Sequence, residues 1–176
     1  MIQINNLAYS YPKAQVLNNI NMTLEKGRIY GLLGENGVGK TTLLTLLSGL
    51  KKPQSGSIDI DGFTPHERLA SFLKDEYYLP DEVVPVHCSA ESWAKNTGLF
   101  WDNYSHEKFM IILNEFDVDP KQMMTRMSNC QLKKTYISFA LACGAKYLSL
   151  DEPTNGLDIP SKAKFRTAPM KYTLAD

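Results

Sequence analysis

The residues with the clearest chemistry lie between Gly34 and Thr42 and read Gly-Glu-Asn-Gly-Val-Gly-Lys-Thr-Thr. This stretch contains the pattern G-x-x-x-x-G-K-T, whose glycines let backbone N–H groups point inward around a phosphate. The helix that such a loop opens adds partial positive charge at the same place. Lys40 is predicted to reach the β- and γ-phosphates of a nucleotide, and Thr41 to offer its hydroxyl to a magnesium ion. A glycine-rich turn that binds nothing is the alternative.

A second group with chemical potential is the acidic pair Asp151-Glu152, which follows the short apolar run 147–150. An aspartate at the carboxyl end of a buried strand suits magnesium binding, either directly or through water. Glu152 projects differently and could orient and deprotonate an attacking water molecule. An acidic pair at the start of a loop would be the simpler interpretation of these two residues alone. The run Thr-Asn-Gly-Leu-Asp at 154–158 follows directly and argues against it.

The elements that must position these motifs follow an α/β pattern. Alternating or continuous apolar residues predict four strands, over residues 2–7, 17–24, 28–33 and 57–62. The third of these strands leads into the glycine-rich loop. Helical spacing predicts three helices, over residues 41–50, 105–116 and 133–143. Ser105 is a candidate N-cap for the second helix.

Composition narrows the setting. Lysine plus arginine and aspartate plus glutamate number 19 each in 176 residues, so no overall charge favours nucleic acid or an anionic membrane as a partner. Cys88, Cys130 and Cys143 show no C-x-x-C spacing, which argues against a zinc site or disulfide framework and favours a reducing cytosol. The first residues do not resemble a signal peptide, and no stretch nears the roughly 18 apolar residues of a membrane helix. We therefore expect any membrane role to come through a partner.

In this order and spacing the motifs resemble those of the ATP-binding subunit of ABC transporters, and the likeness extends from the N-terminus to about Arg166. Gly34–Thr42 matches the Walker A loop of that family. Leu148–Glu152 matches its Walker B strand with the catalytic glutamate, and Asn155–Asp158 matches its D-loop. Met127–Gln131 lies where the family has its signature, usually Leu-Ser-Gly-Gly-Gln.

The resemblance implies an α/β fold with a P-loop NTPase core, a small antiparallel β subdomain and a helical subdomain, incomplete at the C-terminus. The whole chain, 1–176, is expected to be a single ABC-type nucleotide-binding domain. Its core and β subdomain would lie in about 1–75 and 144–166, its helical subdomain in about 76–143 and a tail in 167–176.

The resemblance also implies binding and hydrolysis of ATP with Mg²⁺, with Glu152 as the catalytic residue and Thr41 and Asp151 as metal ligands. Tyr11 would stack on the adenine ring, and Ser128 would contact ATP from the other subunit. The remaining nucleotide contacts would come from the loop residues Gly34, Glu35, Asn36, Gly37, Val38, Gly39, Lys40, Thr41 and Thr42.

Two such domains, identical or different, would meet head to tail and bury two ATP molecules. Each ATP would then be held by one subunit's Walker A loop and by the other's signature, because the open side of a γ-phosphate needs N–H or positive partners. Hydrolysis would separate the pair and drive a transmembrane permease subunit. This places the chain in the cytoplasm, peripheral at the inner face of the plasma membrane.

Two departures from the family pattern concern residues around the nucleotide. Asn129 and Cys130 replace signature glycines, and a Cβ there would crowd a phosphate. Asparagine tolerates positive φ, so Cys130 is the greater obstacle and weaker trans binding is expected. The family's magnesium-linking glutamine has no clear counterpart. Alignment puts Asp75, or else Lys74, in its place, with an ordinary surface loop as the alternative.

The third departure lies after the D-loop. The family continues with another core strand that ends in a histidine contacting the γ-phosphate, whereas His66, His87 and His106 all precede Asp151. Pro169 is predicted to end the last helix. We therefore expect a truncated domain that is less stable than a complete one and hydrolyses ATP poorly or not at all.

Other functions compete with this one. A nucleotide-binding regulatory or interaction module with little or no turnover is the main alternative, favoured by the weak signature and the missing histidine. A small-molecule kinase would share the phosphate loop but has no need of residues 151–158. A soluble ABC-type ATPase acting on ribosomes or DNA would show a basic patch or paired domains. Tyr77 and Tyr78 lie where the family grips its permease, so they are expected at a partner surface, with core packing as an equal alternative.

Overall fold

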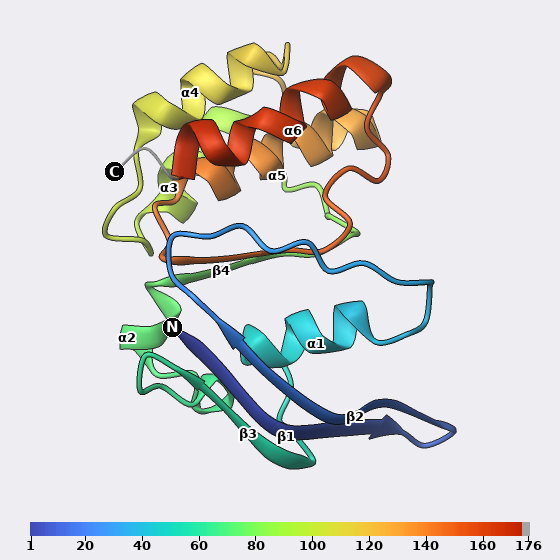
Figure 1. Cartoon of the computed structure of the whole chain (residues 1–176). Helices are drawn as coiled ribbons and strands as arrows, with labels where there is room; N and C mark the ends of the chain where they lie inside the picture. Colours follow the sequence, from blue (N-terminus) through green and yellow to red (C-terminus); the bar gives the residue numbers. More distant parts are fainter. Residues whose placement is uncertain (174–176) are drawn as a thin grey trace. The chain divides into compact units, whose positions relative to one another are not determined.

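Figure 1 shows the computed structural model of the chain, which describes residues 1–173. Contacts between Cα atoms divide the chain into two compact units, Met1–Leu73 and a second unit from Lys74 onward. The first unit holds a small sheet with α1, and the second holds most of the helices.

The first unit is built on an antiparallel sheet in the order β2-β1-β3. Its strands are β1 (Ile2–Tyr11), β2 (Ala14–Leu24) and β3 (Ser55–Ile60). The central strand places Ile2 opposite Leu24 on one side and Ile60 on the other. These strands confirm the predictions at residues 2–7 and 17–24, with β1 extending beyond its predicted end, and confirm the strand predicted at 57–62 except for its last two residues, which form a turn after Ile60.

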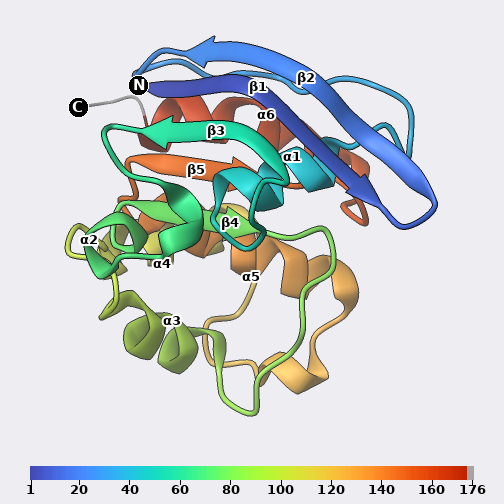
Figure 2. The same ribbon diagram turned by 90° about the horizontal axis from the view of Figure 1, so that it is seen from below.

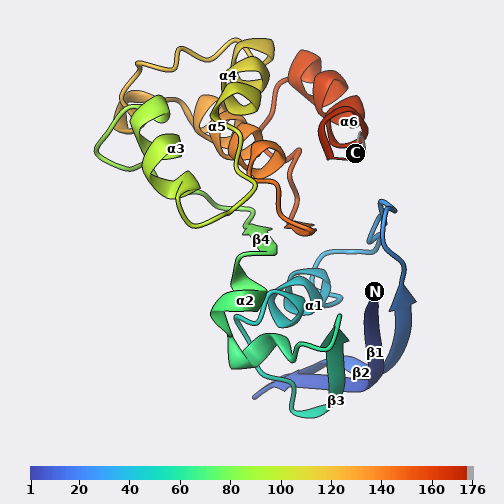
Figure 3. The same cartoon turned by 90° about the vertical axis from the view of Figure 1, so that its left-hand side faces the viewer.

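Three short helical elements complete this unit: α1 (Lys40–Leu47), the 3₁₀ turn η1 (Pro65–Glu67) and α2 (Ala70–Leu73). Figures 2 and 3 show α1 alongside the three-stranded sheet. Leu46 of α1 is fully buried, as are Leu7 and Ile60 of the sheet. This apolar layer fixes the helix whose first turn follows the glycine-rich loop.

The predicted strand at residues 28–33 is wrong. None of these residues belongs to a strand within the described part of the chain, and the side chain of Leu33 is 93% exposed. An extended apolar segment becomes a strand only when a neighbour supplies the hydrogen-bonded ladder, because strand preference reflects packing on a sheet. The ladders of β1, β2 and β3 do not include these residues.

The second unit holds a parallel strand pair and most of the helices. The strands β4 (Glu76–Leu79) and β5 (Tyr147–Leu150) pair in parallel, with Glu76 opposite Tyr147 and Leu79 opposite Leu150. The helical elements are α3 (Ala90–Gly98), α4 (His106–Glu115), η2 (Met124–Arg126), α5 (Asn129–Ala142) and α6 (Ile159–Thr173). The predicted cap of α4 is confirmed, because the Ser105 hydroxyl accepts a hydrogen bond from the Lys108 N–H.

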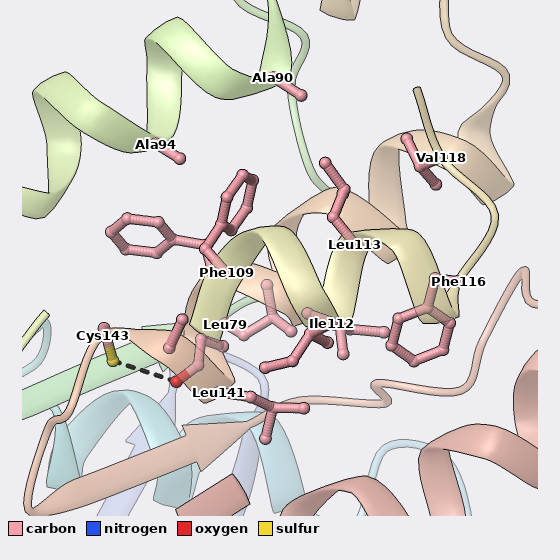
Figure 4. Packing of buried hydrophobic residues seen from close by; sticks show 14 of the residues in the cluster. Leu79, Ala90, Ala94, Phe109, Ile112, Leu113, Phe116, Val118, Leu141 and Cys143 are labelled. Carbon is pink, nitrogen blue, oxygen red and sulfur yellow. Dashed lines mark hydrogen bonds between the residues drawn. The ribbon is translucent and has the colours of Figure 1, made fainter. Parts of the chain in front are cut away.

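The core of the second unit joins β4 to α4 and α5. Figure 4 shows Phe109 and Ile112 of α4 near Leu79 of β4 and Leu141 of α5. On α5, the Phe139 ring is in contact with four other aromatic rings at centroid separations of 4.9–5.6 Å, those of Tyr77, Trp93, Trp101 and Tyr104. Because these rings come from β4, α3 and the segment before α4, their packing fixes β4 against α5.

The prediction that Pro169 ends the last helix is wrong, since α6 continues through it to Thr173. A proline inside a helix removes one backbone donor and crowds the preceding turn. Here contacts on both sides of the proline hold the helix. Phe165 and Ala168 are buried, and the Lys108 ammonium donates to the Tyr172 carbonyl at 3.2 Å. The last part of the predicted tail, residues 174–176, lies outside the described residues.

Across residues 1–173, no helix combines the length and the apolar character that crossing a bilayer requires.

Candidate active site

The candidate residues divide between the two units. Tyr11 and Gly34–Thr42 lie in the first unit, whereas Ser128, Asp151 and Glu152 lie in the second. Within each unit, the candidate residues are held by that unit's own helices and strands.

The glycine-rich loop ends where α1 begins. Gly39 is the N-cap of α1 with φ at 104°, and Gly37 has φ at 86°. Both values lie in the left-handed region that favours glycine. At Gly39 a side chain is also excluded by space, because a Cβ there would lie 2.9 Å from the carbonyl oxygen of Val16 on β2. The sequence therefore needs glycine at this point both for conformation and for contact with the sheet.

Lys40, the first residue of α1, folds back over this loop. Its ammonium donates hydrogen bonds to the carbonyl oxygens of Gly34, at 2.8 Å, and Glu35, at 3.0 Å. The side chain thus spans from the end of the loop to its beginning and places a positive charge beside it. A cation held over a glycine-rich loop at a helix N-terminus is suited to binding phosphate oxygens.

Tyr11, at the end of β1, lies next to the same helix. Its hydroxyl is 3.4 Å from the hydroxyl of Thr42, and this contact is the largest cause that lowers the pKa of Tyr11. Its ring also packs edge-on against Tyr9 and lies under the Lys51 ammonium, which is 5.2 Å from the ring centroid. The structure therefore brings Tyr11, predicted from the sequence as an adenine contact, to the helix that the glycine-rich loop opens.

Asp151 directly follows β5 in the second unit and is buried. Its backbone N–H donates to the Leu79 carbonyl at 2.9 Å, which continues the pairing of β5 with β4. Its carboxylate accepts a hydrogen bond from the Tyr78 hydroxyl at 3.2 Å. Burial, followed by the charge of Asp151, raises the pKa of Tyr78, so the phenol stays a donor to this carboxylate.

Glu152 is exposed and has φ at 43°, in the left-handed region. A glutamate in that region is strained, and the residue after it is Pro153, which further restricts its backbone. Its carbonyl accepts the N–H of Asn155 at 2.9 Å, which closes the turn that follows. Asp151 is buried and Glu152 is exposed, so the two neighbouring side chains have different surroundings.

The structure points to Asp81, a residue that the sequence analysis missed. Asp81 lies two residues after Leu79, the last residue of β4. Leu79 pairs with Leu150, the last residue of β5, and Asp151 follows Leu150 directly. The side-chain amide of Asn155 donates to both carboxylate oxygens of Asp81, at 3.0 and 3.2 Å. In a parallel pair, the carboxyl ends of both strands lie at the same edge. A search for a polar residue just after the apolar run of β4 could have found it.

The prediction that Asp75, or else Lys74, takes the place of the family's magnesium-linking glutamine is therefore wrong. Both residues precede β4 and lie at the opposite end of the strand pair from Asp151. The Asp75 carbonyl accepts the N–H of Tyr147, the first residue of β5. Its carboxylate pairs with the Lys146 ammonium at 2.5 Å.

The predicted partner surface at Tyr77 is also wrong, and core packing is what the structure shows. The side chain of Tyr77 is buried against Phe139, and burial raises its pKa above its usual range. Tyr78 points its hydroxyl to Asp151. Along a strand, neighbouring side chains point to opposite faces, so Tyr77 packs in the core of the unit whereas Tyr78 contacts Asp151.

Ser128 is the N-cap of α5. Its hydroxyl accepts the N–H of Gln131 at 3.2 Å, and the Gln131 side chain accepts the N–H of Ser128 at 3.0 Å. Asn129 and Cys130 are the first helical residues and have negative φ, so neither position requires the conformational freedom of glycine. The Cys130 thiol donates to the Asp158 carboxylate at 3.5 Å.

A loop of glycines that opens a helix, with an acidic pair at the carboxyl end of a parallel strand, is the arrangement of a P-loop nucleoside triphosphatase. The match of a family model makes this class more specific. The model of the ABC transporter family matches residues 17–155, and the chain belongs to that family.

Known proteins agree with this membership. The chain is 31% identical to the SkfA peptide export ATP-binding protein SkfE of Bacillus subtilis, over 92% of this chain and 70% of the relative. A solved structure of a putative ABC transporter ATP-binding protein from Pyrococcus furiosus has a TM-score of 0.83 at 28% identity, covering 97% of this chain and 84% of the other. A dimeric ATP-binding cassette bound to ADP and Pi shares the fold, with a TM-score of 0.83 at 19% identity, over 97% of this chain and 82% of that one.

Proposed function

We propose that this chain binds ATP with Mg²⁺ and hydrolyses it as the energy-coupling subunit of an ABC transporter. The observation that carries the proposal is the loop ending at Gly39, where left-handed glycines and the Lys40 ammonium meet the start of α1. Family membership supports ATP as the nucleotide. Carboxylate and hydroxyl oxygens suit magnesium, and Asp151 and Thr41 offer both kinds.

Each candidate residue has one role in this proposal. Lys40 and the loop N–H groups bind the phosphates, and Tyr11 contacts the base. Thr41 and Asp151 hold the magnesium ion, which would neutralise phosphate charge. Glu152 orients a water molecule and accepts its proton as that water attacks the γ-phosphorus, while the bond from the γ-phosphorus to the β-phosphate oxygen breaks and ADP leaves.

We further propose a dimer in which Ser128 of each subunit contacts the ATP bound by the other. The structurally similar cassette bound to ADP and Pi is dimeric, which supports this arrangement. The partner driven by this dimer would be a transmembrane permease. The similarity to a peptide export ATP-binding protein supports this partner. The chain would then act in the cytoplasm, at the inner face of the plasma membrane.

A nucleotide-binding module with little turnover is the second candidate. Cys130 favours it. This residue lies at the start of α5, where the family has a glycine, and its thiol contacts the Asp158 carboxylate. A side chain at that place leaves less room for a phosphate from a second subunit.

Two variants separate these candidates. Lys40→Ala should weaken ATP binding by about tenfold or more, since it removes a charged hydrogen-bond donor. Glu152→Gln should bind ATP like the wild type and abolish phosphate release. Binding of labelled ATP and release of phosphate are measured on the same samples. Binding without phosphate release by the wild type would support the second candidate, and undiminished binding by Lys40→Ala would reject both.

A further inference from the structure

Lys133, on α5, is a buried cation beside the candidate active site. Its side chain is only 3% exposed. Burial lowers its pKa, whereas Asp81, Asp151 and Glu152 all favour its charged form. A buried ammonium is costly unless hydrogen-bond acceptors surround it, so its contacts identify what it stabilises.

Those contacts all lie in the segment that follows β4. The Lys133 ammonium donates to the carbonyl oxygens of Pro80, at 3.2 Å, and Asp81, at 2.5 Å. It also lies 3.6 Å from the carboxylate of Asp81. Two of the three ammonium donors therefore meet main-chain acceptors in consecutive residues, and the carboxylate of the second residue lies at ion-pair distance.

Asp81 carries this contact onward to the segment after Asp151. Its carboxylate accepts two hydrogen bonds from Asn155, which lies in the turn closed by the Glu152 carbonyl. Lys133 lies on the helix that Ser128 caps. One chain of polar contacts thus joins three segments that are far apart in the sequence and that each carry a candidate site residue.

We infer that Lys133 is a positioning residue: it fixes the Asp81 carboxylate against Asn155 and so sets the geometry of the turn that carries Asp151 and Glu152. This inference rests on the proposed function, because only that function makes the turn part of a nucleotide site. Lys133 need not touch the nucleotide to act in this way.

Hydrogen exchange of the full chain, followed by mass spectrometry, tests the inference without depending on ATP turnover. In Lys133→Met, the hydrogen-bonded amides of Asn155 and Leu157 should exchange about tenfold faster, the effect of losing hydrogen bonds to a charged group. The amides of β1, β2 and β3 should keep their rates. Equal acceleration throughout the chain would show that Lys133 only stabilises the fold and would overturn the inference.

Lys164→Met is a matched control. The Lys164 ammonium also donates to a main-chain carbonyl, that of Glu115 at 2.5 Å, and to a carboxylate, that of Asp117 at 2.7 Å. It should leave the amides of Asn155 and Leu157 at wild-type rates. If it accelerates them as much as Lys133→Met does, the effect is not specific and the inference fails.

Two further variants keep the test decisive if Lys133→Met does not fold. Lys133→Arg retains the charge and should restore slow exchange at Asn155. Asp81→Asn changes a partly exposed side chain and should accelerate exchange at Asn155 and Leu157, with the amides of β1, β2 and β3 unchanged. Wild-type exchange at Asn155 in Asp81→Asn would overturn the inference.

Nucleotide binding then tests the link to the site. Lys133→Met should bind ATP about tenfold more weakly than the wild type when Mg²⁺ is present, and equally well in EDTA. Equal loss in both conditions would count against a role at Asp151. Failure of the wild type to bind ATP would reject the proposed function, and the exchange rates would still decide whether Lys133 positions the turn.

Discussion

Glu152 is held in a backbone conformation that a glutamate adopts at a cost. Its φ of 43° lies in the left-handed region, next to a buried aspartate and before a proline. Strain of this kind is retained where surrounding structure fixes it, and it is common at functional sites. The strained backbone at Glu152 is therefore consistent with the functional role proposed for this residue.

This strain predicts an unusual order of stabilities. Glu152→Gly should be about 1 kcal/mol more stable to urea than Glu152→Ala, because only glycine tolerates the left-handed region without a Cβ contact. At Lys162, exposed in α6, the order should be the usual one, with alanine better than glycine by about 1 kcal/mol. If alanine is also the better residue at position 152, the backbone there is not strained.

At the scale of elements, the sequence predicted what local patterns decide. The Ser105 cap of α4, the strand at 2–7 and the alternating apolar residues at 17–24 involve neighbours within a few positions, and all were confirmed. The apolar segment 28–33 has the same local character as a strand but no hydrogen-bonded partner among the described strands. Local pattern does not report the presence of a partner, so this prediction failed.

The site shows the same division. The Walker A loop and the acidic pair could be recognised because their residues are consecutive. Asp81 was missed because its relation to Asp151 depends on the register of β4 against β5, with Leu79 opposite Leu150. Lys133 was missed for a similar reason, since its partners lie about 50 positions earlier in the sequence. Register and tertiary contact, rather than spacing, decide such residues.

Pro169 gives a prediction for α6. The helix continues through this proline although it lacks a backbone donor, and tertiary contacts such as the buried Phe165 support it. Pro169→Ala should therefore stabilise the protein by about 1 kcal/mol or more in urea denaturation followed by circular dichroism. Thr167→Ala, an exposed change in the same helix, should have an effect within about 0.5 kcal/mol. No gain from Pro169→Ala would mean that the helix does not continue past residue 168.

At the scale of the whole molecule, the proposed roles fall to residues of both compact units. The phosphate loop and Tyr11 belong to Met1–Leu73, whereas Asp151 and Glu152 belong to the unit from Lys74 onward. Under the proposed function one ATP would bind residues of both groups, and a ligand favours every state in which the residues that bind it are folded. ATP should therefore slow exchange in segments far apart in the sequence, although neither unit supplies the full set of contacts.

Hydrogen exchange with and without ATP and Mg²⁺ measures this coupling. We expect protection at residues 37–43, including the Leu43 amide that donates to the Gly39 carbonyl, and also at Asp151 and Asn155. At 100 times the dissociation constant, binding stabilises the folded state by about 2.7 kcal/mol, which gives about a hundredfold slowing at amides that exchange only through unfolding. Lys40→Ala should remove the protection in both units at the same ATP concentration. Protection confined to the phosphate loop would show that Asp151 does not share the ligand, and the proposed division of roles between the units would then be wrong.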